Sequence, residues 1–414
     1  MSLLFLFAFL IPFPLFFDLL SRSFVVHPVV YNQVLVEAGV PVPIGLPAAA
    51  LLIFIAMPRV LSLRVSRTTA ISLLGLAIFW AVEFQKADPL KLLAMSLPVL
   101  MLLAMAAVAA RPRAVAKIAG GYAAGLLIQT LLHSASILFY SPGRETFVAS
   151  SRDFFGFEIY QAMLSYSAIL SAAGAGALIY ALAQRTTAKR LAVLALASPA
   201  YLIVISATRK AALADMAILF LINAVLLLKQ IRFPKIYMLR REALTNAVIF
   251  LAIALAGGLF ILFSPREISL GFALEQRSGN YQGVMAALPT LDFSQILTGY
   301  APGWGGYSNL LIELFVRSGV IGLFAYLTAL SLAFMRFGRA LLASAGELSR
   351  SVKSDIYMKS WFWFALGTFL VGNLVNVNVQ LPYFMTNFIM INVCFVHFLV
   401  RFHDEDAPVT EGGK

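Results

Sequence analysis

Long apolar runs separated by short polar connections are the feature that most constrains how this chain can fold. The runs fall at residues 3–20, 45–58, 69–84, 89–110, 118–140, 161–184, 191–207, 211–228, 243–264, 307–335, 360–380 and 384–400. A helix needs about 20 mainly apolar residues to cross a bilayer. The pattern therefore predicts an all-α polytopic membrane protein with about twelve transmembrane helices, in which residues 1–414 form a single transmembrane domain.

The composition agrees with this prediction and excludes other classes of protein. Of the 414 residues, 61% are hydrophobic and only 12% are charged, whereas soluble domains carry about 25% charged residues. The single cysteine excludes a domain held together by disulfides. The net charge of +12 does not indicate nucleic acid as a partner, because the basic residues are scattered between apolar runs and do not gather on one face.

The positions of lysine and arginine predict the orientation of the chain in the membrane. Cytoplasmic loops carry the excess of these residues, and here they concentrate in alternate connections, at 59–67, 111–117, 185–190, 229–241, 336–359 and 401–414. Both termini are therefore expected in the cytoplasm, with the other loops facing outward. The 3–20 run counts as a retained span, because this alternation works only if it is kept and because it lacks a basic start.

The remaining basic residues lie at predicted outward ends, against the charge bias, and so need another explanation. Lipid headgroups are sufficient partners for Arg22, Lys86 and Lys91, whose long side chains can reach them. The others lie in or beside the outward connections 141–160, 208–210 and 265–306, or at the start of the tenth run. We expect the 141–160 and 265–306 connections to form a cap over a cationic site. Arginine offers phosphate a planar two-pronged contact. The candidates for such a site are Arg144, Arg152, Arg209, Lys210, Arg266, Arg277 and Arg317.

Two local patterns mark where this site would lie. Arg209 and Lys210 occupy a turn between two apolar runs that is too short to be a solvated loop, and the next helix would direct its N-terminal N–H groups at the same place. The glycine-rich stretch 299–306 directly precedes the tenth run, at whose start Asn309, Glu313 and Arg317 recur every four residues. These three side chains share a helix face, where a simple Glu313–Arg317 ion pair is the alternative interpretation.

In the order and spacing of these motifs, the chain resembles the bacterial O-antigen ligases and the O-antigen or exopolysaccharide polymerases, which are membrane glycosyltransferases of the GT-C superfamily. Ser308 stands where the lipid A core ligases carry histidine, and this difference favours a polymerase. The matching positions are Thr208 with Arg209, Arg277 with Tyr281, the glycines of 299–306, Ser308 with Asn309, and 319–323.

The resemblance implies a donor glycan joined through pyrophosphate to undecaprenol, and a second lipid-linked unit as acceptor. It implies catalytic roles for Arg209 and Arg277 at the pyrophosphate and for Ser308 and Asn309 at the reacting groups. No cofactor and no metal are expected, because lysine and arginine would carry the charge of the leaving group. A chain-length regulator protein is a further expected partner. The substrate-binding residues would be Lys210, Arg266, Arg152, Arg144, Tyr281, Glu313 and Arg317.

Two other functions stay open at this point. An O-antigen ligase would transfer the glycan to lipid A core. A lipid-linked oligosaccharide flippase would also need many spans and cations for pyrophosphate, although transporters usually place ionisable residues near the bilayer midplane and show related halves. The general base is equally open among Asp153, Glu275, Asp292 and Glu313.

Overall fold

The computed structural model describes residues 2–13, 16–17, 24–25, 45–62, 66–84, 86, 89–140, 153–154, 157–158, 169, 173–174, 176–177, 180–181, 186–206, 248, 282–300, 310–346 and 382–405. Within them the fold is almost entirely helical. The longer helices are α3 (Gly45–Ser62), α4 (Arg67–Glu83), α5 (Pro89–Ala109), α6 (Pro112–Tyr140), α9 (Thr187–Ser206), α15 (Leu310–Gly346) and α17 (Pro382–Glu405). The prediction of an all-α fold is confirmed.

The short elements are few and lie outside these helices. Helix α1 spans Leu3–Leu10, a 3-10 turn spans Leu288–Thr290, and α14 spans Phe293–Thr298. Two antiparallel hairpins have strands of two residues each. Their strands are β1 (Phe16–Phe17) with β2 (Phe24–Val25), and β3 (Asp153–Phe154) with β4 (Phe157–Glu158).

Two stretches of the described residues, 112–131 and 311–341, are long and apolar enough to cross a membrane. Shorter apolar stretches lie in α3, α5 and α17. Together with the hydrophobic composition, they indicate a membrane protein. The predicted spans at 211–228, 243–264 and 360–380 lie almost wholly outside the described residues, and only scattered positions of 161–184 are described.

The first predicted span does not form as expected. Residues 3–20 were predicted as one helix, but α1 ends at Leu10, and Phe16 and Phe17 belong to a strand. Pro12 explains the end of the helix, because proline has no backbone N–H with which to continue the helical hydrogen bonds. Eight residues of helix extend only about 12 Å, so α1 alone is too short to cross a bilayer.

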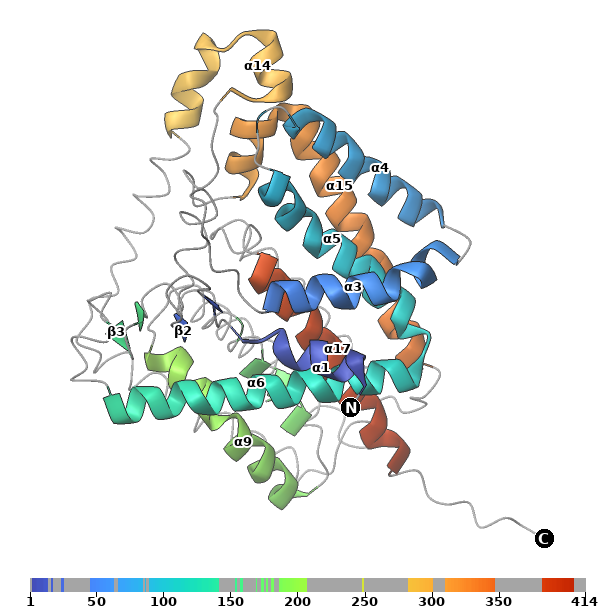
Figure 1. The fold of residues 1–414 in the computed structure, drawn as a ribbon, viewed down its shortest axis with the longest axis vertical. Coiled ribbons are helices and arrows are strands. Elements are labelled where there is room, and N and C mark those ends of the chain that lie inside the picture. Colours follow the sequence, from blue (N-terminus) through green and yellow to red (C-terminus); the bar gives the residue numbers. More distant parts are fainter. Residues whose placement is uncertain are drawn as a thin grey trace.

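The helices pack in two neighbouring groups, as Figure 1 shows. In one group α4, α5 and α15 lie side by side, and in the other α6 contacts α1, α9 and α17. Helix α5 also contacts α3 and α17, and one continuous hydrophobic core runs through both groups. Glycines permit the closest approaches. Gly121 and Gly125 lie against the backbone of α1, where an added Cβ would collide with the carbonyls of Phe5 and Phe9.

Helices α4 and α15 run antiparallel and are joined along their length. The Ser72 hydroxyl donates to the carbonyl of Ala329 at 2.7 Å, and an added Cβ on Gly75 would lie 2.7 Å from the carbonyl of Ala325. At one end of the pair, the Arg336 guanidinium donates to the hydroxyl of Ser66, which caps α4. The opposite end of this helix pair carries the candidate site.

Candidate functional site at the break in α15

Helix α15 is broken near its beginning. Gly319 has φ 62° and ψ −165°, which is not helical, so residues 310–318 and 320–346 are two helical segments with different directions. Positive φ is accessible to glycine because it has no Cβ. The sequence predicts a single span over 307–335. A stretch long and apolar enough to cross a membrane does lie there, at 311–341, but its helix is broken at Gly319. Its Gly319–Leu323 motif contains a break that periodicity alone does not reveal.

The residues before this helix pack directly against the break. Gly299 directly follows α14 and has φ 91°, and an added Cβ there would collide with the carbonyl of Arg317. An added Cβ on Gly319 would collide with the backbone of Leu297. The Tyr300 N–H donates to the carbonyl of Val316 at 2.8 Å. The two backbones are therefore in contact at positions where only glycine fits.

A buried ion pair joins the break to α4. Arg317 Nη2 lies 3.4 Å from Glu83 Oε2, and the two side chains are only 2% and 0% exposed. Glu313, one helical turn before Arg317, is also buried. Removing either partner of a buried ion pair leaves an uncompensated charge, at a cost of about 3–5 kcal/mol. Arg317 is therefore held by the fold through its contact with α4.

Lys86 completes the connection to α4. Its amine donates to the carbonyl oxygen of Thr298 and, at 3.2 Å, to that of Gly299, the last carbonyls of α14. A lysine at a helix C-terminus satisfies free carbonyls and complements the helix dipole. The interpretation of Lys86 as a residue that reaches only for lipid headgroups misses these two contacts. We call this set of residues the clasp: Glu83, Lys86, Thr298, Gly299, Tyr300, Val316, Arg317 and Gly319.

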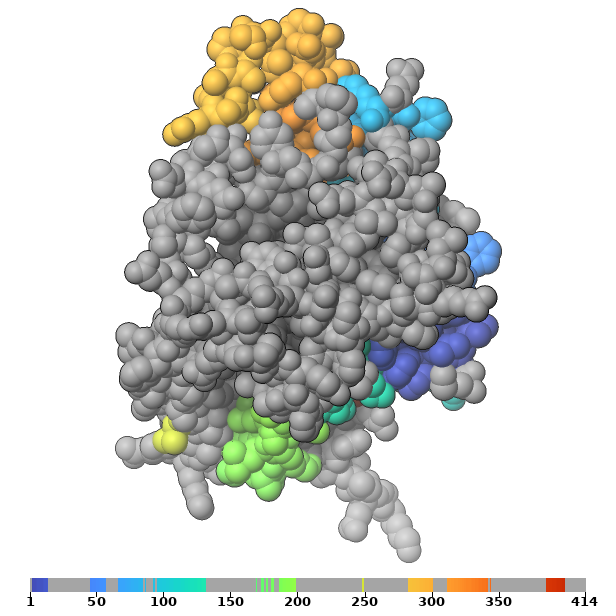
Figure 2. Space-filling model, turned by 60° about the vertical axis from the view of Figure 1, so that its left-hand side comes forward, coloured from blue at the N-terminus to red at the C-terminus, as the bar shows by residue number. Residues whose placement is uncertain are grey.

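The clasp lies at one end of the molecule. In Figure 2 the 282–300 segment forms that end, directly above the visible part of α15. The β3–β4 hairpin, which comes from the other connection expected in the cap, lies along the side of the molecule in Figure 1.

The start of α14 is fixed by a capping box. The carboxylate of Asp292 accepts from the Gln295 N–H at 2.8 Å and from the Ser294 hydroxyl at 2.7 Å, while the Asp292 N–H donates to the Gln295 side chain at 3.1 Å. These bonds, above all the one from the Gln295 backbone, hold the pKa of Asp292 below its ordinary value. The carboxylate is therefore a weaker base than an ordinary aspartate.

This cap predicts a pH dependence confined to α14. Because the folded pKa of Asp292 is lowered, its contribution is complete above the ordinary value of 3.8 and is lost as the pH falls through the lower folded value. We expect the hydrogen-exchange protection factor of the Gln295 amide to fall over that window. In Asp292→Asn, whose neutral side chain also caps helices, protection should not change with pH there. An equal pH dependence in both proteins would contradict this assignment.

Most of the residues predicted for the site lie outside the described residues. Of the predicted site residues, the structure describes Glu313 and Arg317, which lie on the same short helical segment and are both buried. Asp292, a candidate base, is exposed and engaged in the capping box. The predicted residues outside the described part are Arg209, Arg277, Ser308, Asn309, Lys210, Arg266, Arg152, Arg144 and Tyr281.

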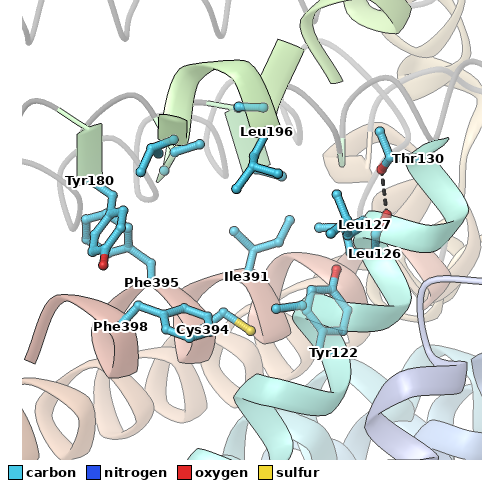
Figure 3. A pocket seen from close by; sticks show the side chains of 17 residues that line it. Tyr122, Leu126, Leu127, Thr130, Tyr180, Leu196, Ile391, Cys394, Phe395 and Phe398 are labelled. Carbon is cyan, nitrogen blue, oxygen red and sulfur yellow. Dashed lines mark hydrogen bonds between the residues drawn. The ribbon is translucent and has the colours of Figure 1, made fainter. Parts of the chain in front are cut away.

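An apolar cavity of about 450 Å³ lies elsewhere, between α6, α9, α17 and residues 173–180. Figure 3 shows Leu196 and Tyr180 facing Ile391 and Phe395 across it. Three polar side chains of its described lining are engaged: the Tyr122 hydroxyl donates to Asn387, the Thr130 hydroxyl to the carbonyl of Leu126, and the Cys394 thiol to that of Ala119. The described lining is otherwise mainly apolar and can accommodate a hydrocarbon.

Sequence reasoning missed Glu83, Lys86 and the break at Gly319. One signal for Glu83 was present, because a carboxylate inside the 69–84 apolar run is costly unless it is paired. Among the described residues, no three His, Cys, Asp or Glu side chains lie together as a metal site would require. No protein-family model and no curated protein matches this chain.

Proposed function

We propose that this chain is a polymerase of undecaprenyl-pyrophosphate-linked oligosaccharide repeat units, of the O-antigen or exopolysaccharide type. It transfers the growing glycan to a new lipid-linked unit at the periplasmic face of the bacterial inner membrane. The observation that carries the proposal is the buried Glu83–Arg317 pair beside the break in α15. Charged side chains and non-helical backbone inside an apolar protein are costly, and they mark functional sites by default.

The ends of α4 and α15 support the proposed orientation. Ser66 and Arg336 meet at one end, and both neighbour basic sets that the charge pattern assigns to the cytoplasm. The clasp lies at the opposite end, which is then periplasmic. The twelve-span layout and the GT-C-like arrangement belong to this proposal.

The proposed reaction breaks the bond between the donor's anomeric carbon and the pyrophosphate oxygen. The acceptor hydroxyl oxygen forms the new bond to that carbon, its proton passes to a base, and the electron pair leaves with the pyrophosphate. Negative charge thus grows on the leaving group in the transition state, where fixed cations accelerate the reaction. Arg209 and Arg277 serve this role, supported by Lys210 and Arg266.

The other residues orient the two sugars. Ser308 and Asn309 direct the acceptor hydroxyl or the donor sugar, and Tyr281 stacks on a sugar ring. Arg144 and Arg152 hold an acidic glycan or the second pyrophosphate. Among the described candidates for the base, Asp292 is disfavoured because its carboxylate is engaged in the capping box, which leaves Asp153 and Glu313. Arg317 serves the site by its fixed position against Glu83.

The proposal is tested with purified protein and a lipid-linked repeat unit, without nucleotide and with a chelator present. We expect a ladder of longer lipid-linked glycans, because the proposal assigns the charge of the leaving group to lysine and arginine. A parallel reaction supplies lipid A core, and transfer to it would instead identify a ligase. A third arm places the protein in liposomes. Movement of the lipid-linked unit across the bilayer without any lengthening would refute the enzyme and favour a flippase.

A further inference from the structure

We infer that Glu83 and Lys86 are positioning residues for the transfer reaction, and that they set the orientation of the 310–318 segment, which carries Glu313 and Arg317. The inference rests on the proposed function and adds to it two residues of the α4 end. Neither residue belongs to the motifs that suggested the function, and neither needs to touch substrate.

The break at Gly319 frees the direction of the short helical segment from that of the long one. In a continuous helix, the direction of residues 310–318 would follow from residues 320–346. The non-helical backbone of Gly319 removes that constraint. Other contacts must therefore determine where Glu313 and Arg317 lie.

The clasp supplies these contacts from two sides. Glu83 holds Arg317 within the short segment, and Lys86 holds the carbonyls of Thr298 and Gly299 in the adjoining turn. That turn also bonds to the 310–318 segment, because the Tyr300 N–H donates to the carbonyl of Val316. The α4 end, the turn after α14 and the 310–318 segment are thus each bonded to the other two, and the α4 end contributes to two of these three connections.

Helix α4 is a suitable reference because it is fixed to the long part of α15. The Ser72 hydrogen bond to Ala329 and the close approach of Gly75 to Ala325 both join α4 to residues 320–346, the long segment of α15. Side chains at the α4 end therefore transmit the position of the long segment to the short one. This route bypasses Gly319.

Stability alone does not account for the buried pair. A buried ion pair is often no more stable than an apolar replacement. Within the described part of the chain, Glu83 Oε1 and Ser318 Oγ are buried without a hydrogen-bond partner, which adds cost. An arrangement that costs free energy and specifies geometry fits a positioning role.

The test compares Lys86→Met with Lys86→Arg in the elongation assay. Lys86 is exposed, so its removal leaves no buried charge and the protein should still fold. We expect Lys86→Met to lower kcat about 10- to 100-fold, because small displacements of reacting groups have effects of that size, with KM and Tm near the wild-type values. Lys86→Arg, which can still donate to the carbonyls, should recover most of kcat. Glu83→Asp keeps the charge and shortens the side chain, and it should also lower kcat.

Tyr122→Phe is the control. It removes a buried hydrogen bond from Tyr122 to Asn387, between α6 and α17 and outside the clasp, so it should lower Tm and leave kcat unchanged. The inference is overturned if wild-type protein elongates glycans and Lys86→Met does so equally well. It is also overturned if Tyr122→Phe and Lys86→Met lower kcat alike, because the effect would then be a general loss of stability. Failure of wild-type protein to elongate any glycan would refute the proposed function itself.

Discussion

Replacing Gly299 or Gly319 by alanine is expected to destabilise the protein by at least about 2 kcal/mol at each position. Two costs add there. A side chain at positive φ is strained by roughly 1–3 kcal/mol, and forcing an extra methyl group into a packed site costs roughly 1–3 kcal/mol. The added Cβ would collide with the backbone of Arg317 in one case and of Leu297 in the other, and backbone cannot move aside as a flexible side chain can.

Gly283→Ala is the control for this prediction. An added Cβ at Gly283 meets no atom within 4 Å, and its backbone is helical. Alanine should therefore be neutral there or stabilise by about 0.5–1 kcal/mol. The measurement is Tm and the yield of monodisperse protein in detergent. If Gly299→Ala or Gly319→Ala melts at the same temperature as Gly283→Ala, the packing at the break in α15 is wrong.

Replacing Arg209 or Arg277 by alanine is expected to abolish measurable glycan elongation. Loss of one donor that stabilises charge in the transition state lowers kcat by about 10²–10³-fold. If both arginines bind one pyrophosphate, the double variant should be much less impaired than the product of the two single effects, because groups that act as a unit are not additive. The reaction is followed by the length of the lipid-linked glycan per unit of folded protein.

Arg113→Ala is the matched control for these arginines. Arg113 is exposed at the beginning of α6, in a basic set assigned to the cytoplasm. The Arg113→Ala variant removes the same charge at the end assigned to the cytoplasm, away from the proposed periplasmic site. Elongation should persist in this variant, and equal loss in all three variants would show that net charge, and not a pyrophosphate site, explains the effect.

The sequence predicted the helices well where apolar length decides the structure. Helices α3, α4, α5, α6 and α17 form within or around the expected runs, because a long apolar segment without charges satisfies its backbone only as a helix. The first run departs from the prediction near Pro12, because the lack of an N–H at a proline affects the end of a helix more than hydrophobicity does. Counting the spans needs more than these helices, since most of the other predicted runs lie outside the described residues.

The clasp could not be predicted in the same way. Glu83 and Arg317 are 234 positions apart, and Lys86 and Thr298 are 212 apart, so no local spacing links them. The four-residue spacing of Glu313 and Arg317 suggests an ion pair along one helix, but it gives no sign that Arg317 pairs with Glu83 of α4. Glycine in a predicted span was equally ambiguous. Gly75 permits close packing of a continuous helix, while Gly319 ends one.

The most direct measurement is an experimental structure of the protein bound to a lipid-linked diphosphate. The proposed function requires the guanidinium groups of Arg209 and Arg277 to lie within hydrogen-bond distance of the same diphosphate, on the periplasmic side with the clasp. Two guanidinium groups far apart, or facing bulk lipid with no shared cavity, would contradict it.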